Sequence, residues 1–474
     1  MNAKLFKLTA MAAAALMLAG CASVNFDQAV GQTNQTASAF TGGKLALRQT
    51  AEQNAAKSKL SSELLSKTLS SDDAVQLALA NSAAVQSLLA QSWADMSAAN
   101  QAGRISNPLF KFERVIAGNE LELGRVLSFG LLDLLTLPRR QSIAQSQIAQ
   151  ARVQLSANVV EQVTQTRQAW VRAVAANQIL QYAQQINTAA QASAELARRM
   201  QQVGNFNKLQ RARQQVFYAD STAQLASAQH AALAAREELV RQLGLTDSQA
   251  GQLQLPDRLP DLPRGARAPA LVSSAALEQR LDMQLARAQL DAAGKSQGLN
   301  LLTSLLDVEL DIIRGISFDN ASGVGERATK RGYELGIRLP IFDWGNARRD
   351  SMNAQSLAAA NRYESTVRSA TSQLRESYSA YRTAYDVARH YRDEVVPLRK
   401  TMADENLLRY NGMLIGVFEL LADTRDQISS VVTAINAYQQ FWLADAALSA
   451  SMIGKPTSVM MAAPAAAGSG DKPH

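Results

Sequence analysis

The stretch Tyr333-Glu-Leu-Gly-Ile-Arg-Leu-Pro-Ile-Phe-Asp-Trp-Gly-Asn346 decides the fold of this 474-residue chain. In it, apolar Leu335, Ile337 and Leu339 alternate with other residues, which is the period of a strand with one apolar and one polar face. From Ala347 to Val396 the chain contains neither proline nor glycine and is rich in helix-forming residues. A strand, a turn and a helix of about 50 residues, roughly 75 Å long, are therefore expected in succession.

The same pattern occurs earlier in the chain. Glu122-Leu-Gly124 corresponds to Glu334-Leu-Gly336, and the pair Arg139-Arg140 corresponds to Arg348-Arg349 after three extra residues in the first copy. A long helical run follows both. We therefore interpret the chain as a duplication, in which each copy consists of a helix, two strands, a long helix, a turn and a second long helix.

Composition narrows the class of protein. Aromatic residues make up only 5% of the chain, whereas alanine and glutamine dominate long tracts. This is typical of long helices that pack through small residues and keep polar faces in water. The formal net charge is +7, and Lys4 and Lys7 contribute to it from an expected signal segment. Basic residues are scattered among acidic ones, which is typical of solvated helix faces and argues against nucleic acid as a partner.

The N-terminus has the features of a secretory signal. Lys4 and Lys7 precede an apolar run over residues 8–18 that is too short to span a membrane. Small residues lead to Cys21, the sole cysteine of the sequence, so no intramolecular disulfide can form. Residues 1–20 are expected to be a lipoprotein signal peptide and Cys21 the lipidation site. The alternative is an ordinary signal peptide.

The first copy follows a polar segment. Residues 21–70 are expected to be a lipidated, extended tether with some helix near its end. The first copy is expected over 71–243, where Ser71 or Asp72 suits the start of a helix. Its later elements are a β-hairpin over 109–129 with a turn at Gly118-Asn119, a helix from about Arg139 to Gln202, and a returning helix from Asn207 to Leu243.

Four prolines mark residues 244–271 as a linker between the copies. The second copy is expected over 272–454, and residues 455–474 are expected to be a disordered tail. The expected elements of the second copy are a helix over 272–293, a β-hairpin over 301–342 with a first strand over 301–318 and a polar loop over 319–330, the long helix to Val396, and a last helix after a break at Tyr410–Gly412.

Two hairpins supply four strands, each long enough to cross a bilayer when tilted. Four strands cannot close a membrane barrel, and an open sheet edge in lipid leaves backbone groups without hydrogen-bond partners. If these strands lie in a membrane, several chains must share one barrel, and three chains would supply twelve strands. The expected fold class is mostly α with a small β part.

Four motifs occur together: the lipobox formed by Cys21 and the small residues before it, the duplicated halves, the strand that leads into Leu339-Pro-Ile-Phe-Asp-Trp-Gly345, and the turn after Tyr410 that precedes Phe418-Glu-Leu-Leu421. In combination they resemble the TolC family of outer-membrane channel proteins. The resemblance covers residues 70–455. It implies a homotrimer in the bacterial outer membrane, lipid-anchored, with a shared twelve-stranded transmembrane β-barrel and a periplasmic tunnel of long α-helical hairpins. It also implies a passive exit duct for efflux or type I secretion.

The implied partners are a periplasmic adaptor (membrane fusion protein), an inner-membrane RND or ABC-type transporter, and outer-membrane lipid. The resemblance also implies a pore constriction at two hairpin turns, Val203–Arg213 and Tyr410–Asp426. Glu419 lies nine residues after Tyr410, where the family has an acidic ring. A ring of three Glu419 carboxylates would favour cations. The alternative is an exposed glutamate that the dipole of its helix stabilises.

The other constriction candidates depart from the family pattern. The second acidic position falls on Ala422, with Asp423 beside it, and the acidic partner in the first hairpin falls on Lys208. The constricting arginine of the family falls on Ile415. These departures argue against the usual closing hydrogen-bond network of the family.

The sequence contains no pattern for catalysis. His230, His390 and His474 are far apart, and no His, Cys and Asp residues occur at metal-ligand spacing. No glycine-rich phosphate loop follows a strand, so energy must come from a partner. We expect no enzyme activity, no cofactor and no metal site. The methionines Met413, Met452, Met460 and Met461 are more typical of packing or tail residues than of copper ligands.

Two other classes of protein remain as alternatives. A periplasmic coiled-coil adaptor would need β-rich domains around a single helical hairpin, whereas two long hairpins are expected here. A structural lipoprotein without a pore would contain no strands, and the alternation from Leu335 to Leu339 argues against it.

Overall fold

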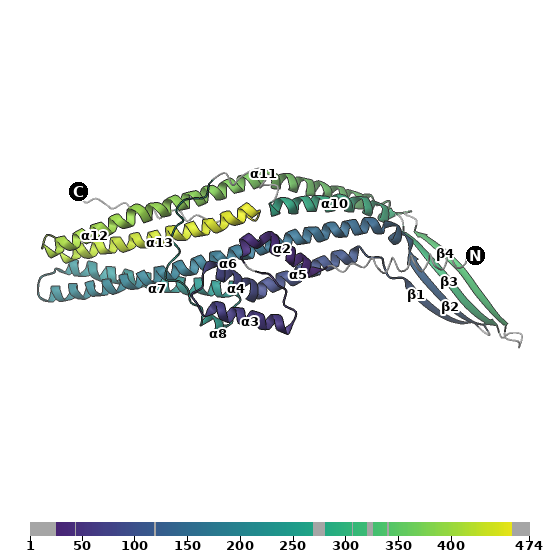
Figure 1. The fold of residues 1–474 in the computed structure, drawn as a ribbon, viewed down its shortest axis with the longest axis horizontal. Helices are drawn as coiled ribbons and strands as arrows, with labels where there is room; N and C mark the ends of the chain where they lie inside the picture. The colour runs from purple at the N-terminus through teal and green to yellow at the C-terminus, as the bar shows by residue number, and fades with distance from the viewer. Residues whose placement is uncertain are drawn as a thin grey trace. The chain divides into compact units, whose positions relative to one another are not determined.

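The structure, a computed structural model, describes residues 25–42, 44–117, 120–268, 280–305, 307–319, 326–338 and 341–456. Several predictions fall outside these residues: the signal segment, the lipidation site Cys21, the turn at Gly118-Asn119 and the tail beyond residue 456. Figure 1 shows the order of the elements along the chain.

The chain is mostly helical with one small sheet, which confirms the predicted fold class. In the order of the chain, the elements that Figure 1 labels, together with the π-helical turn η2, are α2 (Phe26–Thr41), α3 (Ala51–Leu65), α4 (Ser71–Asn81), α5 (Ala83–Ala102), β1 (Leu109–Ala117), β2 (Glu120–Gly130), α6 (Leu131–Gln202), α7 (Lys208–Leu243), α8 (Asp247–Ala250), α10 (Leu281–Leu305), β3 (Asp307–Asp319), β4 (Glu326–Arg338), α11 (Asn346–His390), η2 (Tyr391–Val395), α12 (Val396–Asn411) and α13 (Val417–Ile453).

The described residues form two compact units, and each unit takes segments from both halves of the sequence. One comprises residues up to Ala29, Ala90–Gln154 and Met283–Val367, and we call it the sheet unit. The other comprises Val30–Leu89, Leu155–Asp282 and residues from Arg368 on, and we call it the helical unit. The duplicated halves are therefore not two separate compact bodies, although the order helix, two strands, long helix, helix occurs in both.

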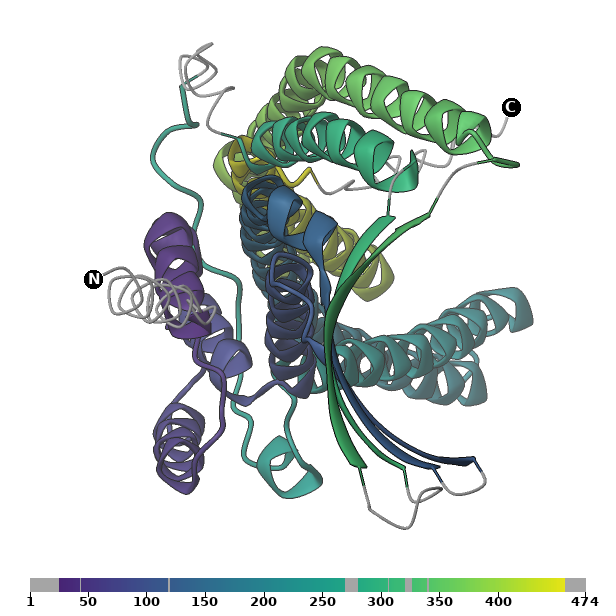
Figure 2. The ribbon, with the colours of Figure 1, turned by 90° about the vertical axis from the view of Figure 1, so that its right-hand side faces the viewer.

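The four strands form one antiparallel sheet in the order β1-β2-β3-β4, curved along its length (Figure 2). The register pairs Phe110 with Leu127, Leu127 with Ile312, and Ile312 with Tyr333. Because side chains alternate across a strand, these residues share one face of the sheet. We call this the apolar face, and its apolar members are Phe110, Phe112, Ile116, Leu121, Leu123, Leu127, Phe129, Val308, Leu310, Ile312, Ile316, Phe318, Tyr333, Leu335 and Ile337.

The helical unit buries its apolar side chains in two clusters. The first joins α3, α4, α6, α7 and α13 around Trp170, Leu239 and Leu243. The second joins α11 and α13, where the ring of Phe441 lies 5.6 Å from that of Tyr381 and 5.7 Å from that of Tyr385. Alanine is frequent in both clusters, because small side chains allow long helices to approach closely.

The predicted tether is more ordered than expected. It contains α2 and α3, and Phe26, Ala29, Val30 and Thr33 of α2 are buried at the spacing of one helix face. α3 (Ala51–Leu65) agrees with the helix predicted near the end of the tether, whereas α2 lies where an extended chain was predicted. The linker is also packed, because Leu253, Leu259 and Leu262 are buried beside the helices.

The second hairpin differs from the prediction at both strands. Leu301–Leu305 continues α10 rather than starting a strand, and regular alternation begins only at Val308. The expected polar loop was too long, because Glu326–Lys330 belongs to β4. Those residues pair with Gly315–Asp319 of β3, and the backbone ladder extends the strand despite their polar side chains.

The second long helix also runs further than predicted. We expected it to end at Val396, before Pro397, but helical structure continues to Asn411. Proline lacks an N–H group and its ring clashes with the carbonyl group four residues earlier. The chain accommodates this with one π-helical turn, Tyr391–Val395, directly before Pro397.

Candidate functional site

The turn between α6 and α7 is closed by local capping. Gly204 adopts the left-handed backbone conformation at φ 82°, which glycine reaches without strain. The side chain of Asn207 accepts a hydrogen bond of 2.8 Å from the backbone N–H of Gln210 and starts α7. Lys208, a predicted constriction residue, is the first residue of α7 and is exposed.

The turn between α12 and α13 lacks such a side-chain cap. Gly416 is the N-cap residue of α13 and offers no side-chain acceptor. Met413 has φ 59° and is the one non-glycine residue of the described chain with positive φ, a conformation that costs about 1–3 kcal/mol. Glu419 lies in the first turn of α13 and is exposed, so its negative charge also stabilises the positive end of that helix.

The structure brings the two turns together. The ring of Phe206, two residues before Lys208, lies 4.4 Å from the ring of Phe418, the neighbour of Glu419. Further along the same helices, the guanidinium group of Arg425 lies 4.6 Å from the ring centroid of Phe217. Both predicted turns therefore belong to one site in the helical unit, which we call the turn site.

The remaining predicted residues have separate positions in the turn site. Asn406 on α12 donates a hydrogen bond to the carboxylate of Asp423 on α13, which joins the two helices of the second hairpin. Tyr410 is exposed near the end of α12, and Ile415 is buried within the turn. Within the part of the chain that the structure describes, no ion pair joins Lys208 to Glu419.

Sequence reasoning missed the contacts that hold the turns side by side. Phe206, Phe418 and Asn406 were not predicted as site residues. A signal for the rings did exist, because a phenylalanine stands beside each turn in a chain with 5% aromatic residues. The pairing of the two rings depends on the tertiary structure.

Two arginines share one carboxylate near the first turn. The guanidinium groups of Arg198 and Arg199 donate hydrogen bonds of 2.7 to 2.8 Å to Glu195 and lower the pKa of its carboxyl group to about 2. All three residues lie on the last turns of α6. The carboxylate therefore stays ionised over the physiological pH range.

The turn site exposes apolar side chains. Met413 and Leu414 of the second turn are 94% and 74% exposed, and Val203 of the first is 70% exposed. Large apolar side chains gathered at one place on a surface are typical of a site that contacts another molecule.

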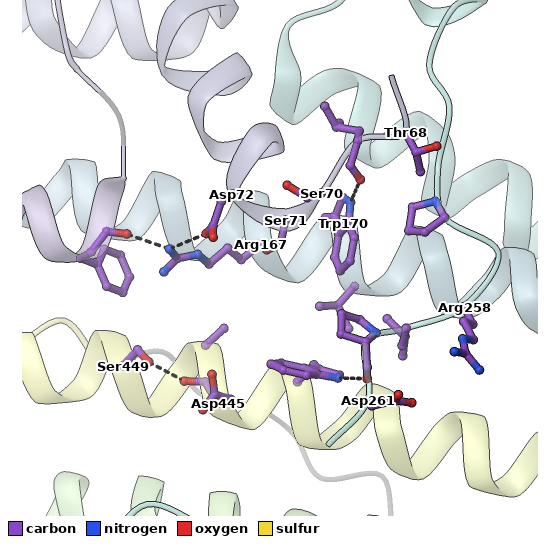
Figure 3. Close-up of a pocket in the computed structure, with 18 of the residues that line it drawn as sticks. Thr68, Ser70, Ser71, Asp72, Arg167, Trp170, Arg258, Asp261, Asp445 and Ser449 are labelled. Atoms are coloured by element: carbon purple, nitrogen blue, oxygen red, sulfur yellow. Dashed lines mark hydrogen bonds and ion pairs between the residues drawn. The ribbon is translucent and has the colours of Figure 1, made fainter. Parts of the chain in front are cut away.

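A cavity of about 1010 Å³ lies elsewhere in the helical unit (Figure 3). Several of its polar groups have partners within the chain. Arg167 donates to the carbonyl of Phe40 at 2.8 Å, and Arg267 lies 2.9 Å from Asp445. The indole N–H groups of Trp170 and Trp442 donate to backbone carbonyls at 2.9 and 3.1 Å. Burial raises the pKa of Asp445, although Arg267 acts in the opposite direction. The cavity lies between α4, α6, α13 and residues 256–267.

Among the described residues, no group of three or more His, Cys, Asp or Glu side chains is close enough to hold a metal ion.

In the described part of the chain, every helix is too short or too polar to cross a membrane.

The fold and the turn site allow comparison with known proteins. Residues 272–403 match the family model described as outer membrane efflux protein. The CmeC outer membrane channel of Campylobacter jejuni has a TM-score of 0.66 at 14% identity, covering 84% of this chain and 86% of CmeC. The outer membrane protein VceC of Vibrio cholerae has a TM-score of 0.64 at 17% identity, covering 81% and 96%. This chain has the fold of these outer-membrane proteins.

A membrane protein from Pseudomonas aeruginosa is similar as well, with a TM-score of 0.65 at 20% identity over 85% of this chain and 94% of that protein. A comparison with curated protein sequences finds no match. The resemblance predicted from the sequence is confirmed, since residues 272–403 match the outer membrane efflux protein model and the chain shares the fold of the outer membrane channel CmeC. The family and fold neighbours are channels rather than enzymes.

Proposed function

We propose that this chain is the outer-membrane channel component of a tripartite efflux or type I secretion system. It would act as a passive exit duct for substrates that an inner-membrane RND or ABC-type pump and a periplasmic adaptor deliver, with no catalytic step of its own. The observation that carries the proposal is the four-stranded sheet, which has one apolar face and two unpaired edges.

The sheet requires further strands to exist in a bilayer. Strands β1 and β4 each pair on one side only, and unpaired backbone groups in lipid cost several kcal/mol each. If β4 of one copy pairs with β1 of the next, three copies close a barrel of twelve strands with the apolar faces outward. The strands have 9 to 13 residues, which suits tilted membrane strands.

The N-terminus supports a lipid anchor in the same membrane. Cys21 follows small residues at the end of the signal segment, and Ala22 rather than aspartate comes next. In lipoproteins, this absence of aspartate favours delivery to the outer membrane. We therefore place the protein in the outer membrane, anchored through Cys21, with its helices in the periplasm.

The turn site supports contact with an adaptor and control of the pore. The exposed side chains of Met413, Leu414 and Val203 offer an apolar surface for the adaptor. Three copies would bring three Glu419 carboxylates around one axis, which would favour cations. Tyr410, Asp423 and Lys208 complete the proposed constriction, with Asp423 also tied to Asn406.

Electrophoresis without boiling and planar-bilayer recordings test the channel. The purified protein should migrate as a trimer before boiling and as a monomer after it, and should give discrete conductance steps. A protein that stays monomeric and does not insert into bilayers would contradict the proposed barrel. That result would favour the adaptor or the structural lipoprotein instead.

The Glu419→Ala variant tests the constriction separately. We expect the variant to form the same trimer but to lose cation selectivity. Glu405→Ala is the matched control, because Glu405 is also an exposed acid but lies on α12, outside the turn. Equal selectivity in all three proteins would exclude Glu419 from the constriction and leave the channel itself intact.

A further inference from the structure

The apolar face of the sheet carries a row of arginines. Arg125 of β2 pairs directly with Arg314 of β3, which pairs directly with Arg331 of β4. Arg114 of β1 pairs with Leu123 and therefore lies diagonally beside Arg125. All four side chains are exposed, and each lies near the middle of its strand. We call these four residues the arginine row.

Among the described residues, no acidic side chain lies on the same face as the arginine row. The described acidic side chains of the strands all occupy the opposite face. They are Glu113, Glu120, Glu122, Glu309, Asp311 and Glu334. Among the described residues, no ion pair involves any member of the row. A further cation on the apolar face, Arg327, lies 6.0 Å from the ring of Phe318.

Without a partner anion, the arginine row destabilises the sheet. Like charges directly opposite on neighbouring strands destabilise a sheet. Apolar rows flank the arginines on both sides: Leu127 and Ile312 lie one register step away in one direction, and Leu123 and Ile316 in the other. A charged group on a lipid-facing surface is unfavourable at depth. An external anion that contacts several guanidinium groups would remove both costs.

The residue type indicates which anion. The row consists of arginines without lysine, and the planar guanidinium group binds phosphate through two parallel hydrogen bonds. Neighbouring strands are about 4.8 Å apart, so the three paired arginines extend over about 10 Å. A lipid headgroup with two phosphates fits this span better than a single small anion.

We propose that the arginine row binds the phosphate groups of a phosphorylated glycolipid in the surrounding leaflet of the outer membrane. The proposal rests on the proposed function, because it requires the apolar face to contact lipid. A second copy of the chain is a poor occupant of this face, since two arginine rows would repel each other. The row would hold the barrel at a defined depth through charge-assisted hydrogen bonds, while the apolar residues on the side of the row toward the helices, such as Leu127 and Ile312, contact acyl chains.

Native mass spectrometry of the detergent-purified trimer tests the proposal. The probes are a diphosphorylated glycolipid (lipid A), its monophosphorylated form, and phosphatidylcholine as a zwitterionic lipid. We expect the diphosphorylated probe to bind the wild-type protein most tightly. Each arginine near a membrane surface contributes about fivefold in affinity for anionic lipid, so Arg314→Gln should weaken its binding about fivefold. Arg125→Gln combined with Arg331→Gln should weaken it further.

Two variants control for general effects. Lys111→Gln removes a cation from the opposite face of β1 and should leave lipid binding unchanged. Arg314→Lys keeps the charge but loses the bidentate geometry, and should bind with intermediate affinity. Equal binding of the lipids to wild type, or equal loss in Lys111→Gln and Arg314→Gln, would overturn the proposal.

The outcome is separable from that of the proposed function. Trimer migration and conductance steps are measured on the same preparations. A conducting trimer without preference for the phosphorylated probe overturns the arginine-row proposal alone. A protein that neither forms trimers nor conducts overturns both.

Discussion

The two compact units use the same residue types in opposite ways. In the helical unit, Phe441 is fully buried and Tyr381 is 1% exposed. In the sheet unit, Phe110 is 61%, Phe112 60% and Tyr333 82% exposed. Outside the turn site, the helical unit buries its large aromatic side chains within one chain. The sheet is held by its backbone hydrogen bonds and leaves its apolar face exposed. The folding free energy of the helical unit therefore comes mainly from contacts within one chain. That of the sheet depends on lipid and on neighbouring copies.

Truncation of one phenylalanine in each unit should give the largest contrast. Phe441→Ala removes a ring that contacts Tyr381, Tyr385 and Trp442, and should destabilise the helical unit by about 3–5 kcal/mol. Phe112→Ala should change the stability of the detergent-solubilised protein by less than about 0.5 kcal/mol, because detergent covers that side chain. Thermal unfolding followed by circular dichroism at the helix band measures both. A similar loss in the two variants would contradict the comparison.

Substitution of one arginine in each unit should give the next largest difference in stability. Arg280 is 1% exposed and its guanidinium group lies 2.7 Å from the carboxylate of Asp282. Arg280→Gln leaves that carboxylate partly buried without its cation and should cost about 3 kcal/mol. Arg314→Gln on the sheet removes an exposed charge that faces other arginines, and should leave stability in detergent unchanged or raise it. Guanidinium unfolding midpoints report both, and a large destabilisation by Arg314→Gln would show that the sheet depends on a partner within the protein.

Substitution of one glycine in each unit should give a smaller difference in stability. Gly454 ends α13 at φ 96°, and a Cβ atom there would lie 2.6 Å from the carboxylate of Asp282 and 2.7 Å from the backbone nitrogen of Leu281. Gly454→Ala should destabilise the helical unit by about 1–3 kcal/mol. A Cβ atom added at Gly332 of β4 would meet no other atom within 4 Å. The stability of Gly332→Ala should therefore stay within about 0.5 kcal/mol of that of wild type. Hydrogen exchange at the end of α13 localises the first effect, and full protection there in Gly454→Ala would contradict it.

The sequence predicts the fold where local patterns and tertiary structure agree. Alternation from Leu335 onward marks β4, and the absence of proline and glycine marks the long helices. The prediction fails where a partner segment decides the structure. Polar Glu326–Lys330 becomes a strand because β3 offers backbone partners, and Pro397 is accommodated by a π-helical turn that no propensity indicates.

The turn site and the arginine row also depend on tertiary contacts that the sequence pattern does not predict. The turns around Gly204 and Gly412 could be located from helix-breaking residues alone. The contact between Phe206 and Phe418 requires knowledge of how two distant hairpins pack. Likewise, Arg114 and Arg125 are visible in the sequence as interruptions of apolar alternation, but only the strand register aligns Arg125 with Arg314 and Arg331.

The smallest expected effect concerns pH and Asp445. Burial raises the pKa of this carboxyl group, and the charges of Arg267 and Arg167 oppose the shift. A group whose pKa is raised in the folded state contributes stability that is complete below its ordinary value of 3.8 and is lost as the pH rises through the raised value. The helical unit should therefore gain stability as the pH falls from neutral toward 4.

Asp445→Asn should remove this gain. The variant keeps a hydrogen-bond acceptor for Arg267 but cannot titrate, so its thermal midpoint should depend less on pH than that of wild type between neutral pH and pH 4. The effect is confined to the helical unit, because Asp445 lies on α13 among buried neighbours. Parallel pH profiles for the two proteins would mean that Arg267 neutralises Asp445 fully. In that case the helical unit would accommodate its buried charge by ion pairing as completely as it buries its apolar side chains.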